Sequence, residues 1–133
     1  MLGHATARAS SADTAYRSID VAGRTATGDP HALVLVMYEE LNRALGAVAS
    51  ATRLGNHAVK SDKISRALTI LFALEGGLDF DRGGDVSHTL ATLYRGARKQ
   101  IVKASLGNDP EPFLAVARNL NEIAAAWRQI RAA

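Results

Sequence analysis

The chain contains no cysteine among its 133 residues. This absence excludes a disulfide framework and a thiolate metal site, and it is compatible with a reducing compartment. No run of about 18 apolar residues occurs, so we expect no insertion into a membrane. The first 13 residues lack the apolar stretch of a secretory signal, which indicates that the protein is not secreted by that route.

Aromatic residues are scarce at 5%, although hydrophobic residues in total make up 47% of the chain. Many of these are alanine, so the core should consist of Leu, Ile, Val and Ala, a composition that favours helices. Charge of either sign is also limited, with 16 Lys and Arg against 13 Asp and Glu and a net charge of +3. This excess falls short of the concentrated positive charge of most nucleic-acid binders.

Turn-forming residues divide the chain into an N-terminal segment and four predicted helices, over residues 31–54, 61–77, 85–107 and 108–133. Asp29 can cap the first helix and Pro30 can occupy its first turn, while Gly55 and Asn56 are good terminators. The short connections predict an all-α fold, an antiparallel four-helix bundle with an N-terminal capping segment. We expect residues 1–14 to be a flexible tail and 15–133 a single domain, with 15–28 as the cap segment and its connection.

The predicted helices differ in the width of their apolar faces. The third helix, with residues such as Val86 and Leu93 on one side, and the fourth each have an apolar arc of roughly 100°, which is sufficient for a bundle core. The first two helices have arcs of roughly 200°, with Glu75 as an unexpected charge inside the second. Either the segment around Tyr16 and Ile19 folds over this surplus, or a partner's amphipathic helix docks there. A third alternative is permanent burial by self-association, and the pattern alone does not separate the three.

Catalytic and metal-binding chemistry finds little support in the sequence. The stretch 79–85 resembles the start of a calcium loop, but the fifth position is Gly83 and the twelfth, which should be a bidentate carboxylate, is Leu90. Glu39 and Glu40 point about 100° apart on a helix, so they cannot work as an acid and base pair. We therefore expect no enzyme activity and no structural metal.

The outer face of the third helix is the one candidate for nucleic-acid binding. Its cations are Arg95, Arg98, Lys99 and Lys103. Because no stacking aromatic shares this face, a solvated surface is the favoured interpretation, and a basic RNA-binding bundle remains the alternative.

Six sequence motifs, taken in order, resemble the flagellin-specific export chaperones of bacteria, the FliS family. They are Ala15-Tyr16-Arg17, Asp29-Pro30-His31-Ala32-Leu33 leading to Met37-Tyr38-Glu39, the turn Leu78-Asp79-Phe80-Asp81-Arg82-Gly83-Gly84-Asp85-Val86, Leu90-Ala91-Thr92-Leu93-Tyr94, Asn108-Asp109, and Ala126-Trp127-Arg128-Gln129-Ile130. Departures at Asp85, Thr89 and Gly96-Ala97 mark a divergent member.

The resemblance implies a chaperone of the bacterial cytosol that needs no cofactor. Such a protein binds the disordered C-terminal region of flagellin, prevents premature polymerisation and delivers the subunit to the flagellar export gate. A disordered segment can bury a large surface in this way, offset by the entropy of ordering it. A structural homodimer that uses the same apolar faces remains an alternative.

The predicted partner-binding residues are the apolar side chains that fall outside the arc needed for bundle packing, together with two placed nearer the core. The first group is Leu35, Tyr38, Ile70, Phe72 and Leu74, and the second is Leu93 and Tyr94. Tyr16 and Ile19 are predicted to act as the cap or in contact with the export gate.

Overall fold

The computed structural model describes residues 30–132, and within that range the side chains of all but residues 30, 127 and 129–132. Its helices are α2 (Pro30–Leu54), α3 (His57–Gly76), α4 (Phe80–Gly83), α5 (Asp85–Ser105) and α6 (Glu111–Ala132). The described part of the chain has no strand, so the prediction of an all-helical bundle is confirmed. The predicted tail, the cap segment, Tyr16 and Ile19 lie outside the described residues.

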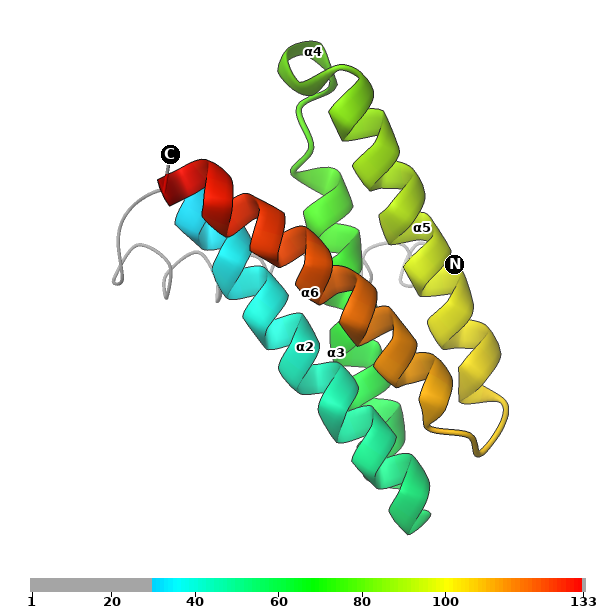
Figure 1. The fold of residues 1–133 in the computed structure, drawn as a ribbon. Helices are drawn as coiled ribbons and strands as arrows, with labels where there is room; N and C mark the ends of the chain where they lie inside the picture. Colours follow the sequence, from blue (N-terminus) through cyan, green and yellow to red (C-terminus); the bar gives the residue numbers. More distant parts are fainter. Residues whose placement is uncertain (1–29, 133) are drawn as a thin grey trace.

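The four long helices form a closed arrangement in which each packs against two others. Helix α2 contacts α3 and α6, and α5 contacts the same two helices, so α2 and α5 lie on one diagonal of the bundle. Consecutive long helices run in opposite directions (Figure 1). Helices α5 and α6 separate toward the end of the bundle that holds α4 (Figure 1).

Two connections differ in detail from the sequence-based boundaries. Helix α3 begins at His57, four residues earlier than predicted, because the side chain of Asn56 accepts a hydrogen bond from the backbone N–H of Val59 and caps the helix. The chain can reverse just before this cap because Gly55 has a φ of 69°, which glycine adopts without strain. In the second connection, a carboxylate oxygen of Asp79 caps the short helix α4 by accepting from two backbone N–H groups.

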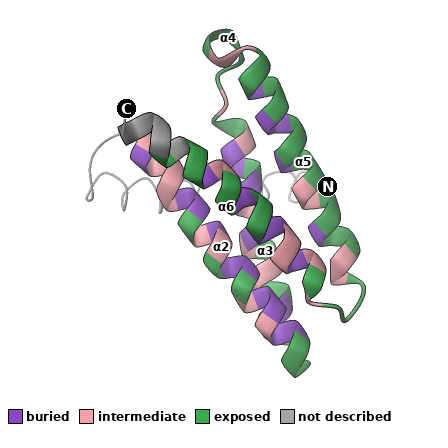
Figure 2. Ribbon diagram, viewed as in Figure 1, coloured by how far each residue is buried: buried purple, intermediate pink, exposed green. Residues whose placement is uncertain are grey.

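The core lies along the inward faces of all four long helices (Figure 2). Its largest fully buried side chains are Tyr94, Phe113, Met37, Leu41, Leu45, Ile70, Leu71, Ile101, Val48 and Val116. One end of the bundle is fixed by the largely buried Lys60, whose ammonium group donates a 2.7 Å hydrogen bond to the carbonyl of Gly107. This bond joins the start of α3 to the connection between α5 and α6.

The apolar face predicted for the third helix is only partly buried. Leu90, Tyr94 and Ile101 are in the core, but Val86 is 65% exposed and Leu93 is 45% exposed. The prediction that these two residues belong to the core face was wrong. The separation of α5 from α6 at this end explains the difference, since a helix without a neighbour on one side leaves that side open.

Candidate functional site

An apolar groove opens at the end of the bundle where the helices separate. Its cavity volume is about 420 Å³, and it lies between the first turns of α2, the last turn of α3, the short helix α4 and the first half of α5. Its lining is Leu33, Val34, Met37, Ala73, Leu74, Gly77, Leu78, Asp79, Arg82, Gly83, Val86, Ser87, Leu90 and Tyr94. The lining is mainly apolar, as expected of a surface that receives apolar side chains of a ligand.

The mouth of the groove is shaped by a close contact between α4 and α5. The hydroxyl of Ser87 donates a 2.8 Å hydrogen bond to the backbone carbonyl of Asp79. A Cβ atom at Gly83 would lie 1.9 Å from the Ser87 Oγ, so a larger residue would require this hydroxyl to move. The glycine therefore permits the hydrogen bond that joins α5 to the start of α4.

Two tyrosines join opposite walls behind the groove. The hydroxyl oxygens of Tyr38 on α2 and Tyr94 on α5 lie 2.5 Å apart, and the ring centroids are separated by 6.5 Å. Both side chains are buried, and Tyr94 also contributes to the lining. Burial raises the pKa of Tyr94 above its ordinary value, and the neighbouring Tyr38 acts in the same direction through its charge and the hydrogen bond.

The structure brings two of the predicted partner-binding residues, Leu74 and Tyr94, into the groove lining. Tyr38 and Ile70 are buried in the core, so the expectation that they lie outside the bundle-packing arc was wrong. The same holds for Leu74, which is largely buried although it reaches the lining. Helices α2 and α3 each pack against two neighbours, so most of a wide apolar arc is buried within the bundle itself.

The other three predicted residues lie outside the groove lining. Leu35 is partly buried against the core, Phe72 is 54% exposed, and Leu93, which was expected nearer the core, is exposed. The groove residues that the prediction missed include Leu33, Val34 and Val86. The wide apolar face of the first predicted helix contains the signal for Leu33 and Val34, whereas Val86 was assigned to the core.

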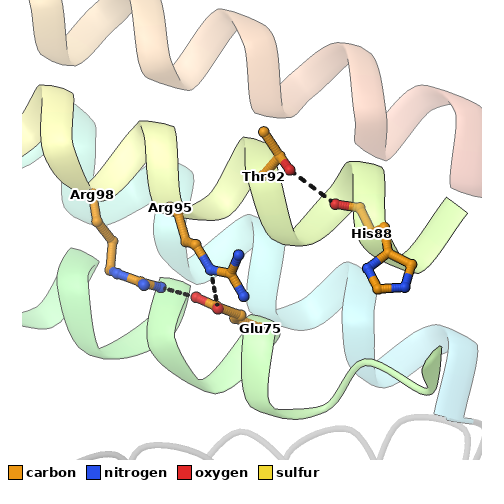
Figure 3. A network of polar contacts seen from close by, with 5 residues as sticks. All are labelled: Glu75, His88, Thr92, Arg95 and Arg98. Atoms are coloured by element: carbon orange, nitrogen blue, oxygen red, sulfur yellow. Dashed lines mark hydrogen bonds and ion pairs between the residues drawn. The ribbon is translucent and has the colours of Figure 1, made fainter. Parts of the chain in front are cut away.

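The unexpected charge inside the α3 apolar arc, Glu75, is paired across the α3–α5 contact (Figure 3). It accepts hydrogen bonds from Arg95 Nε at 2.7 Å and from Arg98 Nη1 at 2.5 Å. Burial alone would raise the pKa of Glu75, but the hydrogen bonds and charges of Arg98 and Arg95 outweigh it and lower the pKa. Two of the four cations of the predicted basic face thus share one carboxylate.

An aromatic ring accompanies this basic face, contrary to the sequence-based expectation. The guanidinium carbon of Arg98 lies 5.9 Å from the ring centroid of Phe72, within the range of a cation–π contact. The ring comes from α3, so inspection of the α5 sequence alone could not reveal it.

The described residues contain no cluster of three or more metal-ligating side chains. Among the helices of residues 30–132, none is both long and apolar enough to cross a membrane.

Comparison with known proteins decides the family. A family model described as flagellar protein FliS matches residues 12–133. The chain belongs to the FliS family. It is 30% identical over 117 residues to the flagellar secretion chaperone FliS of Salmonella typhimurium, and the aligned region covers 87% of each chain. It is 31% identical over 116 residues to the corresponding chaperone of Vibrio cholerae, covering 87% of this chain and 85% of that protein.

A third FliS-family relative is the flagellar secretion chaperone FliSB of Pseudomonas aeruginosa, which is 24% identical over 112 residues and covers 84% of this chain and 89% of that protein. The resemblance to the FliS family found in the sequence is confirmed. Three of the motifs that carried it converge on the groove. Leu33 and Met37 come from the second motif, Val86 from the turn, and Leu90 and Tyr94 from the motif that follows the turn.

Proposed function

We propose that this FliS-family chain is a flagellar secretion chaperone that binds the disordered C-terminal region of flagellin in the apolar groove. In this role it prevents premature polymerisation and delivers flagellin to the export gate, in the bacterial cytosol and without a cofactor. The observation that carries the proposal is the open apolar groove lined by three family motifs. The names of the relatives, which describe chaperones rather than enzymes, support it.

The chemistry of the groove suits an apolar segment of another polypeptide. A partner helix or extended strand would insert apolar side chains between α2 and α5, where Leu33, Val34 and Val86 can receive them. Each fully buried Leu-sized side chain stabilises a complex by about 1.5–3 kcal/mol. Ordering a disordered segment costs on the order of 2–5 kcal/mol, so two or three such side chains would give only weak binding.

The cargo should therefore extend beyond the groove. The outer residues of the first turns of α2 provide the adjoining apolar surface, because Leu35 and Val36 are only partly buried. We keep Leu35 and Leu93 as predicted contact residues, and Leu74 and Tyr94 as lining residues. Phe72 points about 200° away from Leu74 around α3, so we do not place it in the cargo contact. Tyr38 and Ile70 would act from the core by holding the lining in place. Tyr16 and Ile19 stay predicted cap or export-gate residues.

Titration calorimetry with a synthetic C-terminal segment of flagellin tests the proposal on the full chain. The diagnostic variant is Val86→Asp, which places a charge at an exposed position of the lining. Its matched control is Val102→Asp, the same change at a similarly exposed position of α5 outside the lining. We expect saturable binding that weakens at least about tenfold in the first variant, since an uncompensated charge would be desolvated. Binding should change less than about threefold in the control.

Two results would contradict this function. The first is the absence of saturable binding by a wild-type chain with the expected helical circular dichroism. The second is equal loss of affinity in both variants, which would show that the segment does not distinguish the groove from the rest of α5.

A further inference from the structure

A second apolar surface lies on the outside of the contact between α3 and α5. Three of its large hydrophobic side chains are exposed: Phe72 by 54%, Val102 by 51% and Leu106 by 89%. Ile64 and Leu68, on the same side of α3 as Phe72, are only partly buried. We call these five residues the seam row. Single exposed apolar residues are common on proteins, whereas a contiguous row is a candidate docking surface.

Two contacts between the helices set the register along the seam row. Arg98 lies over Phe72, and further along the contact the ammonium group of Lys60 bonds to the carbonyl of Gly107. Because the helices run in opposite directions, each turn forward along α5 matches a turn backward along α3. By this register we expect Val102, one turn beyond Arg98, to lie alongside Leu68. We likewise expect Leu106, the C-cap residue of α5, to lie alongside Ile64.

The seam row and the groove are on different sides of the same helices. Successive residues of a helix are about 100° apart, so Phe72 in the seam row and Leu74 in the groove lining point about 200° apart around α3. The groove residues of α5 are in its first half, whereas Val102 and Leu106 are at its end. A ligand in the groove would therefore leave the seam row accessible.

Charge distinguishes the two edges of the seam row. The α5 edge carries Arg95, Arg98 and Lys99, and Glu75 is the carboxylate that pairs with the two arginines. This edge therefore keeps a net positive charge. The α3 edge, in contrast, presents the uncharged hydroxyls of Ser65 and Thr69. An occupant that complements both edges has acidic residues along one side of an apolar stripe and neutral residues along the other.

We propose that the seam row is a docking surface for an amphipathic helix of a partner protein, with acidic residues along one edge of its apolar stripe, and that it can be occupied while the groove holds its cargo. A second copy of this chain fits less well, since a self-complementary contact would bring the same cations together. An RNA strand fits less well because aliphatic Val102 and Leu106 offer phosphates no partner and the row has a single aromatic ring.

The test uses the full chain and a synthetic amphipathic helical peptide that has leucines at helical spacing and glutamates along one edge. Its control is the same peptide with lysines in place of the glutamates. Fluorescence anisotropy should show saturable binding of the acidic peptide, at least about tenfold tighter than that of the basic one. Val102→Asp and Phe72→Ser should each weaken it by about tenfold or more, while Val86→Asp should leave it unchanged. Saturating flagellin segment should not displace it.

Several outcomes would overturn the proposal. Equal affinity for the two peptides would remove the charge argument, and loss of binding in Val86→Asp would place the peptide in the groove. A dimer in light scattering that Val102→Asp dissociates would assign the seam row to self-association. Competition by an RNA oligonucleotide would assign it to nucleic acid, and displacement by the flagellin segment would assign it to the cargo. Every outcome except the competition with the flagellin segment is independent of whether the groove binds flagellin.

Discussion

The hydroxyl groups of Tyr38 and Tyr94 meet at 2.5 Å between α2 and α5, two helices that make no close backbone contact with each other. The bond therefore crosses the diagonal of the bundle. It lies next to the groove, because Tyr94 and the neighbouring Met37 both contribute to the lining. We infer that this hydroxyl pair helps to fix the separation of the two helices that form the walls.

Removal of one hydroxyl should destabilise the bundle measurably. Tyr94→Phe should lower the free energy of unfolding in urea by about 1–2 kcal/mol, because a buried hydrogen bond is lost. The double variant with Tyr38→Phe should cost less than the sum of the two single changes, since the interaction can be lost only once. Strictly additive costs would show that the two hydroxyls are not coupled.

Alkaline pH should destabilise the protein through Tyr94. Its pKa is raised in the folded state, so the folded protein keeps the phenol protonated while an unfolded chain ionises it near pH 10. The stabilisation is fully present below about pH 10 and is lost as the pH rises toward the folded pKa. Urea unfolding at several pH values should show a steeper decline above pH 10 for wild type than for Tyr94→Phe. Identical slopes would indicate that Tyr94 titrates normally.

Glu75 should stabilise the protein in the opposite pH range. Its pKa is lowered below the ordinary value of 4.5, so the stabilisation is present above about pH 4.5 and is lost as the pH falls through the folded pKa. Glu75→Gln should cost about 0.5–1 kcal/mol at neutral pH, since these pairs are partly exposed to solvent. The exposed Asp62, with one ion pair of 3.7 Å to Lys63, gives the control.

The control Asp62→Asn should change the free energy of unfolding by less than about 0.5 kcal/mol. The difference in the free energy of unfolding between wild type and Glu75→Gln should also disappear in strong acid, where the protonated Glu75 is as neutral as glutamine. A difference that stays constant down to that pH would attribute the effect to packing rather than to charge.

Two glycines should respond to alanine in opposite directions. In Gly83→Ala the new Cβ would displace the Ser87 hydroxyl and break its hydrogen bond to Asp79, at a cost of about 1–2 kcal/mol. In Gly96→Ala, within α5, the Cβ meets no atom within 4 Å, so the better helix former should stabilise by about 0.5–1 kcal/mol. Thermal unfolding checks both. Equal shifts of Tm would show that the α4–α5 contact is not constrained at Gly83.

Local signals in the sequence predicted most of the fold but not the details of the site. The four long helices follow from apolar periodicity and from capping residues such as Asp109, whose carboxylate accepts a hydrogen bond from the N–H of Glu111. The fate of each apolar side chain depends on which turns of its helix lie against a neighbouring helix, and periodicity does not contain this information. For this reason Ile70 is buried and Val86 is exposed, the reverse of what the sequence predicted.

Contacts between helices distant in sequence were likewise beyond prediction. Nothing local to Tyr38 indicates that its hydroxyl meets that of Tyr94, and nothing local to Arg98 indicates that it lies over Phe72. The order of the motifs, on the other hand, identified the family, because it depends on the whole chain rather than on the geometry of one helix.

Fluorescence from a single label in the groove tests the central claim most directly. The chain has no cysteine, so Val86→Cys and Leu106→Cys each provide one labelling site, the first in the groove lining and the second outside it. An environment-sensitive dye at position 86 should shift to the blue, and saturate, as the C-terminal segment of flagellin excludes water from the groove. The same dye at position 106 should not respond. No shift at position 86, or equal shifts at both positions, would contradict binding of flagellin in the groove.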